Sequence, residues 1–279
     1  MRKVVTILGS QGQIGQYMVN FLKNRDFEVR EVDILRAPSE DLRNPTGLWK
    51  SAFDGCDFVY FLAFGVGGSV YLEKYQDSFE FIQNNVLIMS NVFEVLKERR
   101  TKFLFASSQM SSMAFSTYGL LKALGERWTR ALPQGRIVHF WNVYGYESEV
   151  AKFHVISDFI HMALKSGEIS MRTDGSEVRD FLYADDCAEG LYAIYRNFDE
   201  IDSDAPLHLA SHEFVSIGDI AKIVADELHA TVIPGLRTDN VQKMVLNEPD
   251  SYMLQFWKPR TSLSQGIKSI IQEVRSNLE

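Results

Sequence analysis

The stretch Lys3–Gly15 reads KVVTILGSQGQIG, an apolar strand that runs directly into a loop with three glycines. Apolar residues then recur at the three- and four-residue spacing of one buried helix face. Glycines let the backbone bend sharply, let a pyrophosphate approach the amides and let the helix pack closely on the strand. The helix N-terminus adds free N–H groups that favour an anion. The stretch therefore predicts a dinucleotide-binding turn at Gly9, Gly12 and Gly15.

A second predicted strand, Glu28–Val32, leads into Asp33, which lies 18 residues beyond Gly15. At this distance from the glycine loop, a carboxylate can accept hydrogen bonds from the adenosine ribose of a dinucleotide. The same charge would repel the 2′-phosphate of NADP. Asp33 therefore favours NAD as the cofactor, although the nearby Arg36 weakens that argument.

The composition limits the classes of function. Apolar residues make up 46% of the 279-residue chain, which excludes a disordered protein. The net charge of −8 argues against nucleic-acid binding, because no excess of Lys and Arg is present to neutralise phosphates. Cys56 and Cys187 have no metal-ligand spacing around them, so we interpret them as buried thiols and expect no metal. No apolar run is long enough for a membrane span or a signal peptide, and we expect a soluble, cytoplasmic protein.

Strands and helices alternate up to about residue 145, as in a doubly wound parallel sheet of the Rossmann type. Further predicted strands are Cys56–Ala63, Thr101–Ser108 and Arg136–Asn142, and further predicted helices are Ser78–Arg99 and Ser116–Leu132. The strands are apolar nearly throughout, which suits parallel strands covered by helices on both faces. We therefore predict an α/β fold whose residues 1–145 form the dinucleotide-binding Rossmann domain.

Beyond residue 145 the pattern is more mixed and too short for a second dinucleotide domain. We predict a smaller mixed α/β substrate-binding cap over residues 146–279, with some segments returning to the Rossmann domain. The predicted strands here are Val178–Tyr183 and Leu207–Ala210. The predicted helices are Phe153–Leu164, Asp185–Tyr195, Ser216–Leu228 and Leu263–Val274.

The helix Ser78–Arg99 carries two apolar stripes. One stripe consists of Phe79, Ile82, Val86, Met89, Phe93 and Leu96, and the other of Phe81, Ile88, Val92 and Val95. A helix with two apolar stripes needs two packing partners. The sheet is one of them, and either a second subunit or another part of the same subunit is the other.

Tyr118 and Lys122 lie four residues apart and hence on one helix face. A free phenol has a pKa near 10, and an adjacent ammonium together with an oxidised nicotinamide ring would lower it toward useful proton transfer. Ser108, at the end of the preceding strand, can hydrogen-bond the same substrate oxygen. These three residues are the predicted catalytic set.

The motifs together resemble the extended short-chain dehydrogenase/reductases that act on nucleotide sugars, the NAD-dependent epimerase/dehydratase group. The resemblance covers residues 3 to about 225. It rests on the glycine loop, Asp33, Leu62-Ala63, Ser107-Ser108, Tyr118-x-x-x-Lys122, Asn142-Val143-Tyr144-Gly145 and the stretch RDFLYADD that begins at Arg179.

The resemblance implies NAD as cofactor, a nucleotide-diphosphate sugar as substrate, and a homodimer that pairs the helices of residues 78–99 and 116–132. Asn142 and Arg179 would bind the substrate, with Arg179 on the diphosphate, and Ser108 would also contact it. The implied cofactor-binding residues are Gly9, Gln11, Gly12, Gln13, Ile14, Gly15, Asp33, Ile34, Asp41, Leu42, Leu62, Ala63, Phe64, Asn85, Tyr118 and Lys122.

The chain departs from the family's 4,6-dehydratases directly after Ser108. Those enzymes carry Asp-Glu at this point, whereas this chain has Gln109 and Met110, which cannot transfer protons. A dehydratase is therefore disfavoured. Hydride transfer at one carbinol, most simply C4, remains as a 4-epimerase that keeps NAD bound or as a 4-keto reductase that uses fresh NAD(P)H. The alternative from another class is a catalytically idle dinucleotide sensor.

Overall fold

The computed structural model describes residues 2–237 and 248–277. Its main feature is a six-stranded parallel sheet in the order β2-β1-β3-β4-β5-β9. The strands are β1 (Lys3–Leu8), β2 (Phe27–Val32), β3 (Phe58–Phe61), β4 (Lys102–Ser108), β5 (Gly135–Phe140) and β9 (Leu207–Leu209). The order reverses between β1 and β3, which is the point where open α/β sheets bind ligands at their carboxyl edge.

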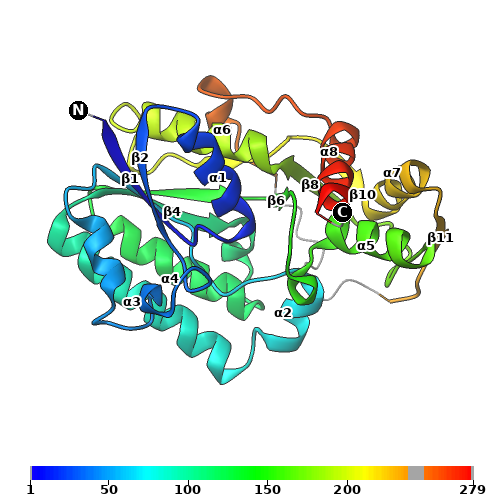
Figure 1. Cartoon of the computed structure of the whole chain (residues 1–279), viewed down its shortest axis with the longest axis horizontal. Helices are drawn as coiled ribbons and strands as arrows, with labels where there is room; N and C mark the ends of the chain where they lie inside the picture. Colours follow the sequence, from blue (N-terminus) through cyan, green and yellow to red (C-terminus); the bar gives the residue numbers. More distant parts are fainter. Residues whose placement is uncertain (1, 238–247, 278–279) are drawn as a thin grey trace.

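Helices cover both faces of this sheet (Figure 1). α1 (Gln13–Lys23) and α6 (Ala184–Arg196) pack on one face, and α3 (Phe79–Arg99) and α4 (Thr117–Arg130) pack on the other. Each face has its own apolar cluster, in which alternate residues of the central strands take part. This double burial explains why the strands show no alternation of polar and apolar residues.

The second part of the chain forms a smaller mixed layer at the right of Figure 1. One sheet has the order β10-β8-β6, and a two-stranded sheet pairs β11 with β7. The strands are β6 (Asn142–Tyr144), β7 (Glu168–Ser170), β8 (Val178–Tyr183), β10 (Phe214–Ser216) and β11 (Thr231–Ile233). The helices α5 (Val155–Ser166), α7 (Ile217–Leu228) and α8 (Leu263–Ser276) share a third apolar cluster with them. We call this part the cap.

Specific contacts join the cap to the larger sheet. The Tyr17 hydroxyl on α1 accepts a hydrogen bond from the Tyr146 amide at 3.0 Å and donates to Glu273 on α8 at 3.1 Å. The Gly68 amide, at the start of α2 (Ser69–Tyr75), donates to the Lys152 carbonyl at 2.9 Å. Hydrogen bonds therefore join the cap to the larger part of the chain both at α1 and at the start of α2.

The predicted fold class is confirmed, and most predicted elements lie within a few residues of the observed ones. One strand was predicted for Arg136–Asn142, but the structure breaks it at Trp141. β5 stays in the large sheet, whereas β6 pairs with β8 in the cap. The sequence analysis also missed α2, β7, β10 and β11, because a three-residue strand or a helix of two turns has too few residues to show a period.

The prediction of two separate apolar stripes on α3 was wrong. The buried apolar residues come from both stripes and form one oblique face: Phe81, Met89, Val92, Phe93, Val95 and Leu96. Phe79 is 70% exposed and Ile82 36% exposed, although both belong to the first stripe. An α-helix has 3.6 residues per turn, whereas residues chosen at alternating three- and four-residue steps repeat every 3.5 residues. Such a row of residues moves gradually around the helix and leaves the buried face over six turns.

Cys187 is buried and Cys56 half-buried, and neither is in a disulfide. Within residues 2–237 and 248–277, no His, Cys, Asp and Glu side chains gather in a group of three or more that could hold a metal ion. None of the helices described is long and apolar enough to cross a membrane.

Candidate active site

A cavity of about 740 Å³ lies between the carboxyl edge of the large sheet and the cap. Both the glycine loop and the cap contribute to its wall. Most of the residues predicted for cofactor, catalysis and substrate line it: Gly9, Gln11, Gly12, Gln13, Ile14, Gly15, Asp33, Ile34, Asp41, Leu42, Leu62, Ala63, Phe64, Ser108, Tyr118, Lys122, Asn142 and Arg179. The structure thus brings together residues that span the sequence from position 9 to position 179.

The glycine loop fits close backbone packing at two of its positions. Gly9 has φ of +85°, and a Cβ there would lie 2.7 Å from the Ala63 nitrogen. A Cβ on Gly15 would lie 2.0 Å from the Gly9 carbonyl oxygen. No side chain caps α1, so its first N–H groups remain available to an anion at the cavity wall. This arrangement fits the pyrophosphate of a dinucleotide.

Asp33 follows β2 and holds the glycine loop in place. Its carboxylate accepts hydrogen bonds from the Gln11 amide at 3.0 Å and from the Leu35 amide at 2.9 Å. A carboxylate has about four acceptor positions, so two of them remain for ribose hydroxyls. Asp33 therefore serves the loop and the expected ribose contact at the same time.

Arg36 is engaged by two carboxylates near Asp33. Its guanidinium lies 2.8 Å from Glu31 and 3.5 Å from Glu40, and Glu40 also accepts the Asp33 amide at 2.8 Å. An arginine held between two carboxylates is less suited to bind a 2′-phosphate. The structure therefore removes much of the objection that Arg36 raised against NAD.

Asp41 and Leu42 line the wall beyond Asp33, where the resemblance implies adenine. The Asp41 carboxylate is bound by the Arg43 side chain, with nitrogen–oxygen distances of 2.8 Å to each oxygen. Hydrogen bonds from this side chain are the largest cause that lowers the pKa of Asp41. Arg43 also donates to Asn84 at 3.1 Å, which fixes the loop against α3. Sequence analysis had not singled out Arg43.

Asn85 does not line the cavity. It is buried on α3, accepts a hydrogen bond from the Gly65 amide at 2.7 Å and donates to the Gly65 carbonyl at 3.2 Å. It therefore acts on the cofactor wall indirectly, by fixing the loop that follows Phe64.

Side chains at the end of α2 fix the start of α4, where Tyr118 lies. Ser116 caps α4 by accepting a hydrogen bond from the Gly119 amide at 3.1 Å. The Gln76 side-chain oxygen accepts from the Ser116 hydroxyl at 3.1 Å and from the Tyr118 amide at 3.3 Å. The predicted proton-transfer residue is thus held by the N-cap of its own helix and by the residue that follows α2.

Lys122 points toward β4, with its Nζ 5.7 Å from the centroid of the Tyr118 ring. Its Nζ donates to the Ala106 carbonyl at 2.7 Å and lies 3.8 Å from the centroid of the Phe64 ring. Burial lowers the pKa of Lys122 to about 7, and the charge of Glu126 opposes that shift. Burial raises the pKa of Tyr118 to about 12, and the Ser108 side chain opposes that rise. In the protein alone, desolvation is therefore the largest effect on the pKa of Tyr118. The expected lowering by Lys122 together with an oxidised nicotinamide ring stays a prediction.

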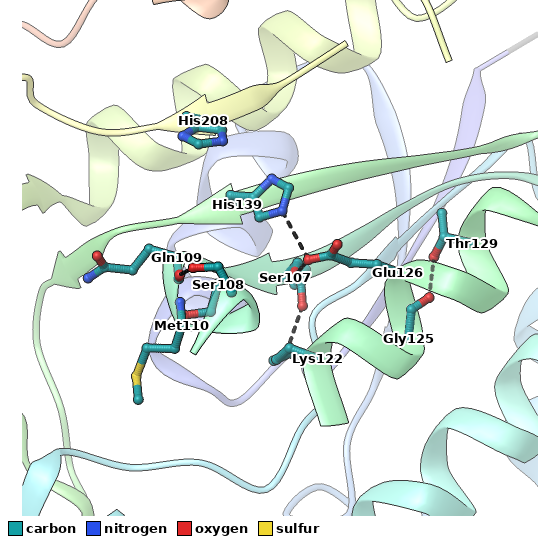
Figure 2. A network of polar contacts seen from close by, with 12 residues as sticks. Ser107, Ser108, Gln109, Met110, Lys122, Gly125, Glu126, Thr129, His139 and His208 are labelled. Atoms are coloured by element: carbon teal, nitrogen blue, oxygen red, sulfur yellow. Dashed lines mark hydrogen bonds and ion pairs between the residues drawn. The ribbon is translucent and has the colours of Figure 1, made fainter. Parts of the chain in front are cut away.

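Ser108 ends β4, and Gln109 and Met110 follow it (Figure 2). The Ser108 side chain lies within hydrogen-bond reach of Tyr118. Its Oγ accepts a hydrogen bond from the Met110 amide at 3.1 Å, so its proton can be donated toward the cavity. Gln109 and Met110 also line the cavity. No carboxyl group stands at either position to exchange a proton with a substrate carbon.

The cap supplies the opposite wall of the cavity. Asn142 begins β6. Its side-chain nitrogen Nδ2 donates to the Asp180 carbonyl at 2.8 Å, which links β6 to β8. Arg179 precedes Asp180 on β8 and lines the cavity. Asp180 itself is buried and accepts hydrogen bonds from the Ser211 amide and hydroxyl at 2.8 and 3.0 Å.

The structure adds polar cap residues that the sequence analysis missed. Glu147 and His154 line the cavity as a pair, 2.6 Å apart between Oε1 and Nδ1. Arg172 and Arg237 lie on the same wall and are joined by a backbone hydrogen bond of 2.9 Å. Arg172 also pairs with Glu73 on α2. None stands in a periodic pattern or motif; only the turn at Asp174-Gly175, just after Arg172, marks this segment in the sequence.

Comparison with known proteins agrees with this geometry. The profile of the NAD dependent epimerase/dehydratase family matches residues 5–210. A protein of Methanocaldococcus jannaschii described as "Putative UDP-glucose 4-epimerase" is 23% identical over 313 residues, covering 98% of this chain and 99% of that protein. UDP-glucuronic acid decarboxylase 6 of Arabidopsis thaliana is 27% identical over 154 residues. That match covers 51% of this chain and 41% of the decarboxylase, so it spans less than half of that relative.

Among solved structures, the epimerase Mth375 of Methanothermobacter thermautotrophicus superposes with a TM-score of 0.85 at 20% identity. The superposition covers 99% of this chain and 93% of that chain. At this level of identity, the similarity shows a shared fold that includes the cap.

Proposed function

The chain belongs to the NAD-dependent epimerase/dehydratase family, and on that premise we propose that it is a nucleotide-sugar 4-epimerase. The observation that carries the proposal is the single cavity in which Ser108, Tyr118 and Lys122 lie between the glycine loop and Arg179. The glycine loop suits a dinucleotide, and an arginine suits a diphosphate. A cavity with both features supports a reaction between NAD and a nucleotide-diphosphate sugar.

The cofactor fit rests on the backbone packing at Gly9 and Gly15 and on the carboxylate of Asp33. Bound NAD would take a hydride from the sugar C4 and return it. The description of one relative as "Putative UDP-glucose 4-epimerase" also supports the proposal.

The chain's own residues would manage the proton on the C4 oxygen. In the oxidation step the Tyr118 phenolate accepts that proton, and Ser108 donates a hydrogen bond to the same oxygen. The Lys122 ammonium would hold the nicotinamide ribose, as the resemblance implies, and its charge together with that of the oxidised nicotinamide would favour the phenolate. After the sugar turns its other face, Tyr118 returns the proton as the hydride comes back, so no net redox change occurs.

The neighbouring side chains limit the reaction to this one carbon. Gln109 and Met110 stand where a dehydratase needs an acid and a base. An amide and a thioether cannot remove a proton from C5 or deliver one to a leaving hydroxyl. Their presence supports hydride chemistry without dehydration.

A 4-keto reductase is the second candidate, and one observation favours it. With its pKa raised to about 12, Tyr118 is a neutral phenol that can donate a proton to a carbonyl oxygen. Reduction needs only that direction of transfer, whereas epimerisation needs both. The position of Arg36 between Glu31 and Glu40 supports NAD over NADP, and thereby the epimerase.

Two measurements distinguish these candidates from each other and from an idle sensor. Mass spectrometry of ligands released from the purified protein identifies the cofactor and its redox state. Turnover is then followed with UDP-, dTDP-, GDP- and CDP-sugars without added cofactor. An epimerase converts one of them to its C4 epimer catalytically. A reductase acts only on a 4-keto sugar with added NAD(P)H, and a sensor does neither.

We also propose a homodimer formed through α3 and α4. Both helices expose large apolar side chains: Phe79, Ile82 and Leu87 on α3, and Leu120 and Leu124 on α4. The two helices pack against each other on one face of the sheet (Figure 1). Adjacent exposed apolar residues of this kind favour burial against a second copy. Sedimentation of a stable monomer at micromolar concentration would contradict this.

A further inference from the structure

Glu126 is a buried carboxylate that the chemistry above does not use. It lies on α4 one helical turn beyond Lys122, so the two side chains share a helix face. Only 7% of its surface is exposed. An ionised carboxylate is costly to bury unless partners compensate for the lost water. Glu126 is absent from the cavity wall, so ligand contact does not explain its position.

Partners from two strands and the next turn of α4 hold this carboxylate (Figure 2). Ser107 on β4 donates from Oγ to Oε1 at 2.5 Å, and Nε2 of His139 on β5 lies 2.9 Å from the same oxygen. Arg130 on α4 donates to Oε2 at 3.3 Å. Burial raises the pKa of Glu126, but His139 and Ser107, with a smaller part from Ser111, lower it to about 2. The group is therefore a carboxylate at neutral pH.

This carboxylate can influence the predicted catalytic residues in two ways. Ser107 precedes Ser108, so its bond to Glu126 fixes the end of β4 against α4. The second way is electrostatic. The Lys122 ammonium is buried and donates a hydrogen bond to the Ala106 carbonyl, which carries no net charge. Burial lowers the pKa of Lys122, and the Glu126 charge opposes this by favouring the protonated form.

We propose that Glu126 is a positioning residue that acts through Lys122 and Ser107. Its buried charge favours the protonated form of Lys122, and its hydrogen bond to Ser107 holds the end of β4 that carries Ser108. The consequence for catalysis rests on the proposed function, because a protonated Lys122 matters only if Tyr118 exchanges a proton with the substrate.

His139 contacts Glu126 directly, and a second imidazole lies behind it. The ring of His139 is tilted against the ring of His208, with ring centroids 4.9 Å apart. His208 accepts hydrogen bonds at Nδ1 from Trp141 at 3.4 Å and from the Asp250 amide at 3.1 Å. Burial and then His139 lower the pKa of His208 to about 4. The outer imidazole is therefore neutral and does not offset the carboxylate.

Arg130 also forms an ion pair with Glu126. Its side chain is 46% exposed, so solvent screens its interaction with Glu126, whereas Lys122 is buried. A charge interaction that is shielded from water is the stronger of the two. We therefore expect the Glu126 charge to affect Lys122 more than Arg130.

The test follows the protonation of Lys122 directly. The full-length protein is labelled with ¹³C at lysine Cε, and the Lys122 signal is assigned by its loss in Lys122→Met. Chemical shift against pH is compared for wild type, Glu126→Gln and Glu126→Asp. We expect the midpoint to move to lower pH in Glu126→Gln and by a smaller amount in Glu126→Asp, which keeps the charge at a greater distance. Glu126→Asp also keeps the test valid if Glu126→Gln does not fold.

Thr129→Val is the matched control. Thr129 is buried on the same helix, and its hydroxyl donates only within α4, to the Gly125 carbonyl at 2.9 Å. This variant should lose some stability and keep the wild-type Lys122 midpoint. If neither Glu126 variant moves that midpoint, or if Thr129→Val moves it equally, Glu126 has a purely structural role and the inference is overturned.

The pH profile of turnover then tests the link to catalysis. Activity of Glu126→Gln should decline at lower pH than that of wild type, with roughly tenfold less protonated Lys122 for each unit by which the midpoint falls. Tyr118→Phe separates the two proposals. If it keeps full turnover, the proposed function fails whatever Glu126 does. If it abolishes turnover while Glu126→Gln keeps the wild-type profile, only the role of Glu126 fails.

Discussion

The Gln11 amide donates to the carboxylate of Asp33 at 3.0 Å, and this bond joins the glycine loop to the end of the neighbouring strand. The loop and the residue expected to contact the ribose are therefore one structural unit. A change at Asp33 should alter both the choice of cofactor and the geometry of the pyrophosphate site.

The first prediction concerns that choice. Wild type should bind NAD more tightly than NADP, because Asp33 accepts from a 2′-hydroxyl and repels a 2′-phosphate. Asp33→Asn should shift the ratio of the two dissociation constants by roughly tenfold toward NADP, the scale of a hydrogen bond to a charged group. Calorimetric titration measures both constants. Glu28→Gln, an exposed carboxylate on β2, is the control, and tighter binding of NADP to wild type would refute the assignment.

The second prediction concerns Asn85. Its side chain is buried and makes three hydrogen bonds, two of them to Gly65. Asn85→Ala should lower the free energy of unfolding by about 1–3 kcal/mol, because the Gly65 backbone groups lose their partners. It should also weaken cofactor binding, since the loop after Phe64 is released. Denaturant unfolding and cofactor titration test the two effects, and unchanged affinity would show that the loop does not depend on Asn85.

Most of the residues that sequence reasoning assigned to the cofactor line one cavity in the structure, and their signals in the sequence are local. The glycine loop, its strand and Asp33 fall within the first 33 residues, and Tyr118 and Lys122 share one helix. The helix that follows the glycine loop also shows apolar residues at helical spacing. The parallel sheet followed from strands without alternation, since only double burial permits such strands.

The cap half was predicted less completely, because its short elements depend on contacts between distant segments. Glu147 and His154 meet through a loop, and Arg172 and Arg237 are brought together by the pairing of β7 with β11. The role of Asn85 was also hidden, since nothing in the sequence indicates that its partner is Gly65. The desolvation of Tyr118 and Lys122 depends on burial from all sides, which spacing alone cannot give.

The third prediction follows from the burial of Lys122. Its pKa is about 7 in the folded protein against an ordinary value of 10.5, so the unfolded chain binds more protons between these values. Stability from this residue therefore rises with pH across that range. Lys122→Met should be most stabilising relative to wild type below pH 7, and the gain should shrink toward pH 10. Denaturant unfolding at several pH values measures it, with the exposed Lys97→Met as control. A difference that does not vary with pH would contradict the burial argument.

The fourth prediction concerns the substrate half of the cavity. Arg179→Met should weaken binding of a nucleotide-diphosphate sugar by roughly tenfold or more, because it removes charge-assisted hydrogen bonds to the diphosphate. Binding of NAD should not change. Arg196→Met, at the far end of α6, is the control. Equal loss of cofactor and sugar-nucleotide affinity would place Arg179 in a general structural role.

The central claim is that Tyr118 transfers the proton during hydride exchange at one sugar carbon. Its most direct test is turnover of the best substrate from the nucleotide-sugar panel by wild type, Tyr118→Phe, Gln109→Ala and Met110→Ala. We predict that Tyr118→Phe keeps its fold and cofactor binding but loses roughly 10²–10⁴-fold in rate, while the other two variants lose far less. Retention of most of the wild-type rate by Tyr118→Phe, or a larger loss in Gln109→Ala, would contradict the account.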